Sequence, residues 1–175
     1  MINEDLKKLE SKLWEAADQL RANSKLTATE YSFPVLGIIF LRHANNRFIK
    51  AEKEIKENRP VHPVRGVKPI KKIDFLAAKA IYLPEKSRWS SIIELPDGVD
   101  TGEHLNEAMR NIEAEYEDLV GVLPKTYNLF EKDLLQQLLR IFNNEVMDNM
   151  PGDAFGHIYE YFLNNFAKSA IGKSL

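Results

Sequence analysis

The chain of 175 residues contains no cysteine, and this absence excludes several kinds of chemistry. Disulfide bridges, thiolate nucleophiles and cysteine-ligated metal ions are ruled out, and such a composition suits a reducing compartment. The first nine residues carry four charges and no apolar run, so they show no secretory signal. We therefore expect a cytoplasmic protein.

Long hydrophobic runs and known catalytic motifs are absent as well. The longest apolar stretch, Pro34–Leu41, is far too short to cross a bilayer, so we expect no membrane contact. The sequence has no glycine-rich phosphate loop, no dinucleotide-binding fingerprint and no hydrolase nucleophile turn. We therefore predict neither a catalytic residue nor a cofactor-binding residue in this chain.

Histidine is scarce, which limits the metal sites that can be considered. The four histidines are His43, His62, His104 and His157. His157 and Glu160 stand three positions apart on one expected helical face, so they could act as a ligand pair. Because no third ligand is suggested, a surface or hydrogen-bonded pair is the favoured interpretation, and we predict no metal site.

Charge is unevenly distributed, although the net charge is only −2. Between Glu94 and Asp118 there are nine acidic residues and a single base. The densest group of acids is Glu113, Glu115, Glu117 and Asp118. We expect these four to form a solvated acidic face, because a general acid–base pair needs environments that drive two pKa values apart.

Positive charge gathers in residues 59–73, which we call the basic segment. Its five bases are the candidate contacts to DNA phosphates: Arg59, Arg65, Lys68, Lys71 and Lys72. No acid lies among them, so they could neutralise several phosphates without reading the base sequence. Three prolines and a glycine exclude regular helix, and we expect an exposed, mobile loop with at most a doubtful strand. A merely solubilising surface loop is the alternative.

Apolar residues recur at helical spacing through most of the remaining chain. Asn3 can cap a first helix that ends near Asn23, and the capping box Thr27–Glu30 opens a second, largely apolar helix. Pro34 should kink this second helix or make it restart with Ser32 as its cap. Further helices are expected at residues 74–82 (capped by Asp74), from Pro84 or Ser87 to Ile93, and at 101–119, 131–142 and 153–170. The predicted fold class is therefore all-α, an irregular bundle of about six to eight helices.

Two tryptophans and two positions near the C-terminal end raise questions of packing. Trp14 and Trp89 could anchor an interface, but core packing is favoured for both. Asp153 fits an N-cap of the last helix. Gly156 lies inside that helix and costs about 1 kcal/mol relative to alanine, and such a glycine usually marks a close approach of the backbone to a neighbour.

Four segments, in the same order along the chain, resemble one family. They are Leu13–Arg21, Glu30–Arg42, Leu83–Trp89 and Gly152–Leu163. The first two resemble the opening of the methylation (M) subunit of type I restriction-modification systems. The third is similar to a short Pro…Trp element of that subunit, and the fourth is similar to the segment that closes its N-terminal helical domain.

The resemblance implies that residues 1–170 form the N-terminal helical domain of an M subunit and that residues 171–175 begin a linker to a methyltransferase domain. In the family, that second domain binds S-adenosylmethionine and methylates the exocyclic amine of adenine. Its aromatic-Thr-Pro and Asn-Pro-Pro-aromatic motifs are absent here. No position of this chain matches a catalytic or cofactor-binding residue of the family. We therefore expect the chain to be a non-catalytic fragment of an adenine-specific DNA methyltransferase.

The partners implied by the resemblance are DNA and other subunits. In the family, two M subunits pair with one specificity (S) subunit, and a restriction (R) subunit can join them. The helical domain helps to clamp the DNA, and could at most stabilise a duplex distorted by adenine flipping. A purely structural protein–protein module without DNA contact is the main alternative. Cofactor binding by the chain itself is weakly supported, and a stand-alone helix-turn-helix regulator would need a recognition helix that is not evident.

Overall fold

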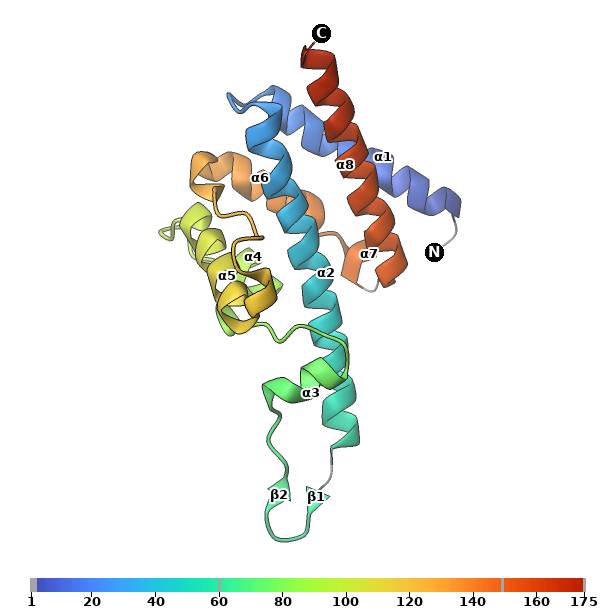
Figure 1. Cartoon of the computed structure of the whole chain (residues 1–175), viewed down its shortest axis with the longest axis vertical. Helices are drawn as coiled ribbons and strands as arrows, with labels where there is room; N and C mark the ends of the chain where they lie inside the picture. The colour runs from blue at the N-terminus through green and yellow to red at the C-terminus, as the bar shows by residue number, and fades with distance from the viewer. Residues whose placement is uncertain (1–2, 60, 149, 175) are drawn as a thin grey trace.

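The computed structural model describes residues 3–59, 61–148 and 150–174, and leaves the side chains of residues 3, 62 and 169–174 undescribed. This part of the chain contains eight α-helices, three short 3-10 helices and one small β-hairpin (Figure 1). The α-helices are α1 (Asn3–Ala22), α2 (Ala28–Asn58), α3 (Lys72–Ala77), α4 (Trp89–Ile93), α5 (Thr101–Glu115), α6 (Lys132–Phe142), α7 (Glu145–Asp148) and α8 (Gly152–Ser174). The 3-10 helices are η1 (Glu85–Ser87), η2 (Glu117–Leu119) and η3 (Tyr127–Leu129). The prediction of an all-α bundle is confirmed.

Helix α2 is the central element, and local sequence sets its start. The hydroxyl of Thr27 accepts a hydrogen bond from the Glu30 N–H at 3.1 Å, and the Glu30 carboxylate accepts one from the Thr27 N–H at 3.0 Å. This reciprocal pair is the predicted capping box. Helices α3, α4, α6 and α8 all pack against α2, which buries side chains such as Tyr31, Val35 and Ile38 completely.

Pro34 does not interrupt α2, so the predicted restart with Ser32 as cap is wrong. A proline inside a helix costs about 3 kcal/mol, because it removes an N–H donor and crowds the preceding turn. Pro34 is buried among core residues, and the hydroxyl of Tyr127 donates a hydrogen bond to its carbonyl oxygen at 2.6 Å. Tertiary packing therefore offsets the local cost, and α2 stays one helix.

Both tryptophans pack inward, as the sequence favoured. Trp89 is buried, and the half-buried Trp14 lies edge-on to two rings of α8. Its ring centroid is 5.3 Å from that of Phe162 and 4.9 Å from that of Phe166. Edge-to-face pairs of this kind contribute roughly 0.5–1.5 kcal/mol beyond the buried area, so they help to join α1 to α8.

Two predicted N-caps lie instead inside the first turn of their helices. Asp74 sits in the first turn of α3, where its carboxylate accepts a hydrogen bond from the Lys71 N–H at 2.8 Å. Asp153 sits in the first turn of α8, because the Pro151 carbonyl already accepts from the Ala154 N–H at 3.1 Å. Each carboxylate still suits the positive end of its helix dipole, which explains why the sequence pattern resembled a cap.

The glycine predicted to mark a close approach is also corrected. Gly156 is exposed, and no neighbouring atom lies within 4 Å of where a Cβ would stand. The close approaches are at two other glycines. A Cβ on Gly37 would lie 2.5 Å from atoms of Pro124 and Tyr127, and one on Gly102 would lie 2.7 Å from the Tyr127 carbonyl oxygen. The segment around Tyr127 can therefore pack on α2 and α5 only because both positions lack a side chain.

Candidate nucleic-acid interface

The basic segment forms the end of an arm that projects from the bundle (Figure 1). We define the hairpin arm as the last turns of α2, the hairpin of β1 (Val61–His62) and β2 (Gly66–Val67), and α3. The hairpin lies at the end of the molecule opposite to the C-terminal end of α8. A large partner can therefore reach the hairpin without first meeting the bundle.

The hairpin replaces part of the predicted loop. Val61 pairs with Val67 and His62 with Gly66 in antiparallel register. The connection 63–65 leads into Gly66, whose φ of +75° is a conformation that glycine adopts without strain and that suits a three-residue hairpin loop. The doubtful strand in this region is thus a real strand pair, with two residues on each side. The side chain of His62 lies outside the described residues.

Four of the five predicted phosphate contacts lie on the hairpin or directly beside it. Arg65, Lys68 and Lys71 are exposed. Arg59 is half-buried, and its guanidinium donates a hydrogen bond to the Lys68 carbonyl oxygen at 3.4 Å, across the open end of the hairpin. The sequence between Arg59 and Lys72 contains no acid, so this end of the molecule carries a local positive field that attracts phosphate.

Lys72, the fifth predicted contact, is tied to the bundle. Its ammonium lies 2.8 Å from the Glu115 carboxylate, and it also donates to the Glu115 carbonyl oxygen at 2.7 Å. The same ammonium lies 5.2 Å from the ring centre of Tyr116. These contacts give Lys72 a role in fixing α3 against α5, and they compete with any contact to phosphate.

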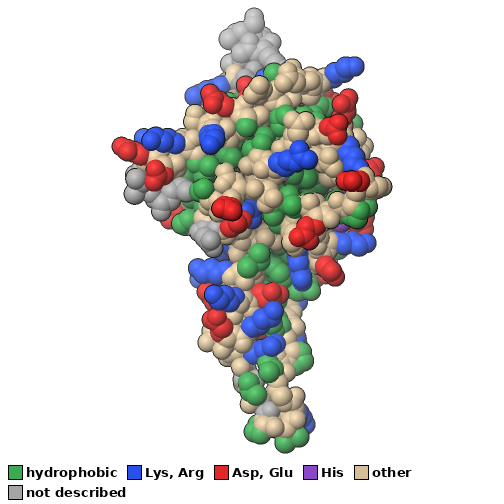
Figure 2. Space-filling view, turned by 180° about the vertical axis from the view of Figure 1, so that it is seen from behind, with side chains coloured by type: hydrophobic (Ala, Val, Ile, Leu, Met, Phe, Trp, Pro, Cys, Tyr) green, Lys and Arg blue, Asp and Glu red, His purple; other side chains and the backbone are tan. Residues whose placement is uncertain are grey.

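Exposed valines on the hairpin are a feature that the sequence reasoning missed. Val64 is 89% exposed, Val61 68% and Val67 44%. Figure 2 shows hydrophobic side chains at the free end of the arm with a cationic side chain at its edge, and further lysine, arginine and acidic side chains closer to the bundle. Three valines at a spacing of three within a basic segment were the available signal. Exposed apolar side chains on a projecting element suggest contact with a partner.

The root of the arm is anchored by aromatic packing and by hydrogen bonds. Phe75 of α3 is buried and stacks on Phe48 of α2, with ring centroids 4.9 Å apart. Arg47 donates a hydrogen bond to the carbonyl oxygen of Lys79 at 2.6 Å, just after α3. Lys79 itself adopts a φ of +58°, which is uncommon for a residue with a side chain. The bundle thus holds α3, and the hairpin extends beyond this anchored part.

The predicted acidic face is only partly a solvated surface. Glu113 is buried, and its carboxylate lies 2.5 Å from the Lys125 ammonium and accepts from the Leu123 N–H at 3.3 Å. Burial alone would raise the pKa of Glu113, but these hydrogen bonds and the charge of Lys125 outweigh it and lower the pKa. Glu113 is therefore an ionised structural partner, whereas Glu117 and Asp118 are exposed as expected.

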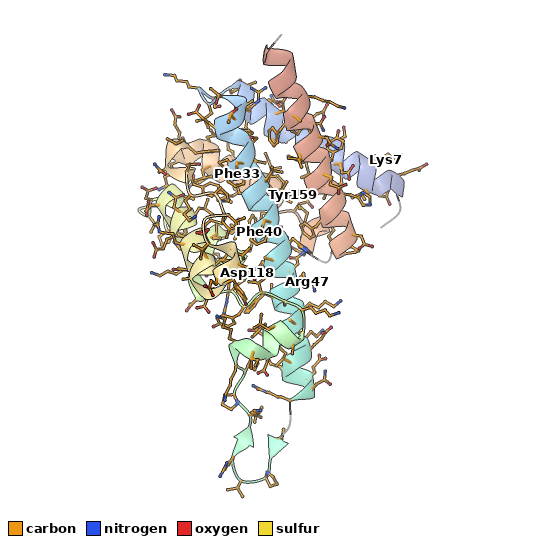
Figure 3. The ribbon with its side chains drawn as sticks, in the orientation of Figure 1. Lys7, Phe33, Phe40, Arg47, Asp118 and Tyr159 are labelled. Carbon is orange, nitrogen blue, oxygen red and sulfur yellow. The ribbon has the colours of Figure 1, made fainter. Side chains whose placement is uncertain are left out.

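A surface cavity of about 650 Å³ lies beside the arm, between α2 and the start of α8. Its cationic lining comes from Arg47, Lys50 and Lys53, which are exposed and spaced by three along α2. In Figure 3, Arg47 lies on α2 between the bundle and the arm. Burial, and then the charge of Arg47, lower the pKa of His43, which also lines the cavity. No motif in the sequence indicated this cavity.

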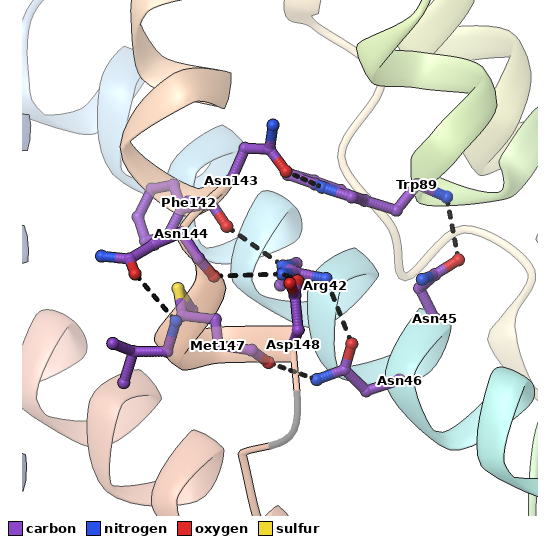
Figure 4. Close-up of polar contacts among 10 residues, drawn as sticks. Arg42, Asn45, Asn46, Trp89, Phe142, Asn143, Asn144, Met147 and Asp148 are labelled. Atoms are coloured by element: carbon purple, nitrogen blue, oxygen red, sulfur yellow. Dashed lines mark hydrogen bonds and ion pairs between the residues drawn. The ribbon is translucent and has the colours of Figure 1, made fainter.

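A polar network beneath the cavity joins α2 to the chain between α6 and α8 (Figure 4). Arg42 is buried, and its guanidinium donates to the Phe142 carbonyl oxygen at 3.0 Å and to the Asn144 carbonyl oxygen at 3.3 Å. It also pairs with the Asp148 carboxylate, which lines the cavity, and it stacks over the Trp89 ring at 5.3 Å. This arrangement is structural, because it satisfies the groups that end α6.

Neither a metal site nor a membrane span is evident in the same described ranges. They hold no group of three or more histidine, aspartate or glutamate side chains placed to bind a metal ion. His157 and Glu160 are both exposed on α8. None of the helices in these ranges has the length and apolar character needed to cross a bilayer.

Fold and surface together define an all-α domain with a projecting basic hairpin. The profile of one protein family, the HsdM N-terminal domain, matches residues 9–142. The chain therefore belongs to the HsdM N-terminal domain family. It is also similar to the type I restriction enzyme MjaIX methylase subunit of Methanocaldococcus jannaschii, with 34% identity over 176 residues. That match covers 91% of this chain and 31% of the relative, so the chain spans about a third of the relative's length.

Proposed function

We propose that this domain holds DNA by its phosphate backbone and helps to assemble a type I adenine-specific DNA methyltransferase, while catalysing no step itself. The observation that carries the proposal is the group of cations on the projecting hairpin. Contacts of lysine and arginine with phosphate fix a protein on the duplex without reading its sequence. The family membership supports the same function.

The five cations contribute unequally. Arg65, Lys68 and Lys71 are exposed on the hairpin or just after it, and Arg59 lies at its open end. We expect these four to make the principal phosphate contacts. Lys72 contributes least, because the Glu115 carboxylate already neutralises its charge.

The cationic row on α2 extends this surface toward the bundle. Arg47, Lys50 and Lys53 recur at a spacing of three, which keeps them near one side of the helix. Asp148 and Glu54 also line the cavity and weaken the field there. DNA held by the hairpin would therefore find weaker, secondary contacts along this row.

The remaining partners belong to the longer protein that the resemblance implies. We propose that the domain meets a specificity subunit, a second methylation subunit and, where present, a restriction subunit. S-adenosylmethionine would be bound by the methyltransferase part. The cavity beside the arm does not fit that cofactor, because Arg47, Lys50 and Lys53 would repel its sulfonium and no glycine-rich loop is available to hold it.

The salt dependence of DNA binding tests the phosphate contacts. The variant Arg65→Ala/Lys68→Ala/Lys71→Ala should bind a short duplex more weakly, and to the same extent for every sequence. A plot of log affinity against log salt concentration should become shallower by about 0.9 for each phosphate that the variant no longer neutralises.

A matched control separates local contact from net charge. Lys7, Lys8 and Lys12 are exposed on α1, far from the hairpin in sequence, and their replacement by alanine removes the same total charge. This control should keep the salt slope of the parent chain. If the hairpin variant also keeps the parent affinity and slope, the phosphate role is refuted and the protein–protein module becomes the better account.

A further inference from the structure

The hairpin carries three exposed valines among its cations, and phosphate contact alone does not explain these valines. Val61 and Val67 are directly paired across the two strands, so their side chains share one face of the ribbon. Val64 stands in the connection at the free end and is 89% exposed. Arg59 and Lys68 lie at the opposite, open end. Arg65, which is also exposed, stands beside Val64 in the same connection, so the free end carries one valine and one cation.

The dimensions of this ribbon match one groove of B-form DNA. The major groove is about 12 Å wide and admits a two-stranded ribbon, whereas the minor groove, at about 6 Å, is too narrow without distortion. Each strand has two residues, which at about 3.3 Å per residue extend roughly 7 Å. That length is close to the major-groove depth of about 8.5 Å. A hairpin inserted end-on would bring its tip to the base edges and its open end to the phosphates.

We propose that the hairpin enters the DNA major groove end-on, with Val64 and the neighbouring Arg65 at the base edges, Val61 and Val67 further from the groove floor, and Arg59 and Lys68 at the phosphate rims. This proposal rests on the proposed function and adds the groove, the orientation and the apolar component. Contact of Val64 with thymine methyls favours A·T pairs weakly, because aliphatic groups can contact the thymine methyl and find no equivalent on cytosine.

Charge selects DNA over a protein partner for this tip. A hairpin that carries both apolar and cationic side chains fits a partner surface with an apolar floor and anionic walls. The major groove supplies both, through thymine methyls and two rows of phosphates. The four cationic side chains of Arg59, Arg65, Lys68 and Lys71, with no acidic residue between them, make the match stronger than for an ordinary apolar protein patch.

Chemical probing of the bound duplex tests the groove directly. Dimethyl sulfate methylates guanine N7 in the major groove and adenine N3 in the minor groove, so one reagent reports on both. We expect the 175-residue chain to protect guanine N7 on a short mixed-sequence duplex and to leave adenine N3 reactive. Protection of adenine N3 with reactive guanine N7 would overturn the proposal.

Replacing the three exposed valines tests their contribution without changing the charge of the hairpin. Val61→Ser/Val64→Ser/Val67→Ser should lose the guanine N7 protection and bind about tenfold more weakly, with an unchanged salt slope. The matched control Val120→Ser/Val122→Ser/Val146→Ser alters three other exposed valines and should bind like the parent chain. Unchanged N7 protection in the hairpin variant would contradict the insertion.

A modified duplex provides a test that needs no protein variant. Replacing thymine by uracil removes the C5 methyl group, and we expect it to weaken binding of the parent chain several-fold while hardly affecting the serine variant. The outcomes separate the two proposals. If the alanine charge variant changes the salt slope but the serine and uracil tests show no effect, the phosphate function stands and groove insertion fails. If the charge variant shows no effect, the proposed function itself fails.

Discussion

The bundle and the hairpin arm use the same kinds of residue in opposite ways. In the bundle, aliphatic and aromatic side chains are buried, and the principal charged groups inside it, Arg42 and Glu113, have several partners each. On the hairpin, Val61 and Val64 are exposed, and most cations of the basic segment face solvent. Burial of side chains therefore stabilises the bundle, whereas the exposed valines of the hairpin add little buried surface.

This difference indicates that the bundle provides stability and that the hairpin provides a surface for binding. A two-stranded hairpin is at best marginally stable in water, so the hairpin relies on the parts that flank it. Phe75 and Lys72 fix α3 to the bundle, and α2 carries the other strand outward as a long rigid helix. Substitutions in the bundle should change stability, and substitutions on the hairpin should change binding.

The largest loss of stability is expected at Arg42. Arg42→Ala removes the donors of two carbonyl groups, Phe142 and Asn144, at the end of α6, and also the partner of Asp148. Each unsatisfied buried group costs about 1–3 kcal/mol, so the free energy of unfolding should fall by about 3–5 kcal/mol. Urea unfolding followed by circular dichroism measures this. Lys50→Ala, two turns along the same helix and exposed, should stay within about 0.5 kcal/mol of the parent.

The second prediction uses two glycines with opposite expected signs. Gly37→Ala would place its Cβ 2.5 Å from atoms of Pro124 and Tyr127, and such overpacking should cost about 1–3 kcal/mol. Gly156→Ala meets open space inside a helix and should stabilise the chain by up to about 1 kcal/mol. Thermal unfolding of both variants checks the pair. If Gly37→Ala stabilised the chain as Gly156→Ala is expected to do, the packing around Tyr127 would be looser than described.

The glycines also show where sequence reasoning stops. The close approach predicted at Gly156 is wrong, and the approaches at Gly37 and Gly102 were not predicted. Which face of a helix meets a neighbour depends on residues far away in the chain, here Pro124 and Tyr127. The same limit explains Glu113, whose carboxylate is paired with Lys125, a residue beyond the end of α5. Periodicity and caps are local, and these contacts are not.

Local signals were reliable where the physics is local. The capping box at Thr27 depends only on neighbours within a few positions, and it was predicted correctly. The basic segment was found by its charge. Its hairpin was not, because two-residue strands leave almost no alternating pattern to read. Burial in the core, which no local rule supplies, kept Pro34 inside a continuous α2.

A smaller effect is expected from buried tyrosines at high pH. Burial raises the pKa of Tyr127 well above its usual value, and it also raises the pKa of the buried Tyr31. A raised pKa in the folded state means that the stabilisation is complete below about pH 10 and is lost as the pH rises further. The free energy of unfolding should fall by about 1.4 kcal/mol per pH unit for each tyrosine above that point.

Substitution of Tyr127 distinguishes the stability that comes from its hydrogen bond from the loss of stability caused by its ionisation at high pH. Tyr127→Phe loses the bond to the Pro34 carbonyl oxygen and should destabilise the chain by about 1 kcal/mol at neutral pH. The same variant should lose stability less steeply in alkali, because one titrating group is gone. Tyr159→Phe, on the exposed part of α8, serves as the control and should alter neither quantity. An unchanged alkaline slope in Tyr127→Phe would mean that this hydroxyl is not protected from solvent.

The smallest expected change in the free energy of unfolding is for variants of the hairpin. These variants test most directly whether stability and binding reside in different parts of the chain. Val64→Ser and Lys68→Ala alter exposed side chains at the end of the molecule, so each should leave the free energy of unfolding within about 0.5 kcal/mol of the parent. Urea unfolding should also give an unchanged slope with denaturant, because no additional surface is exposed. A loss comparable to that of Gly37→Ala would show that the hairpin belongs to the cooperative core. In that case, a reduction of DNA binding by hairpin variants would have to be separated from partial unfolding before it counted as evidence for contact.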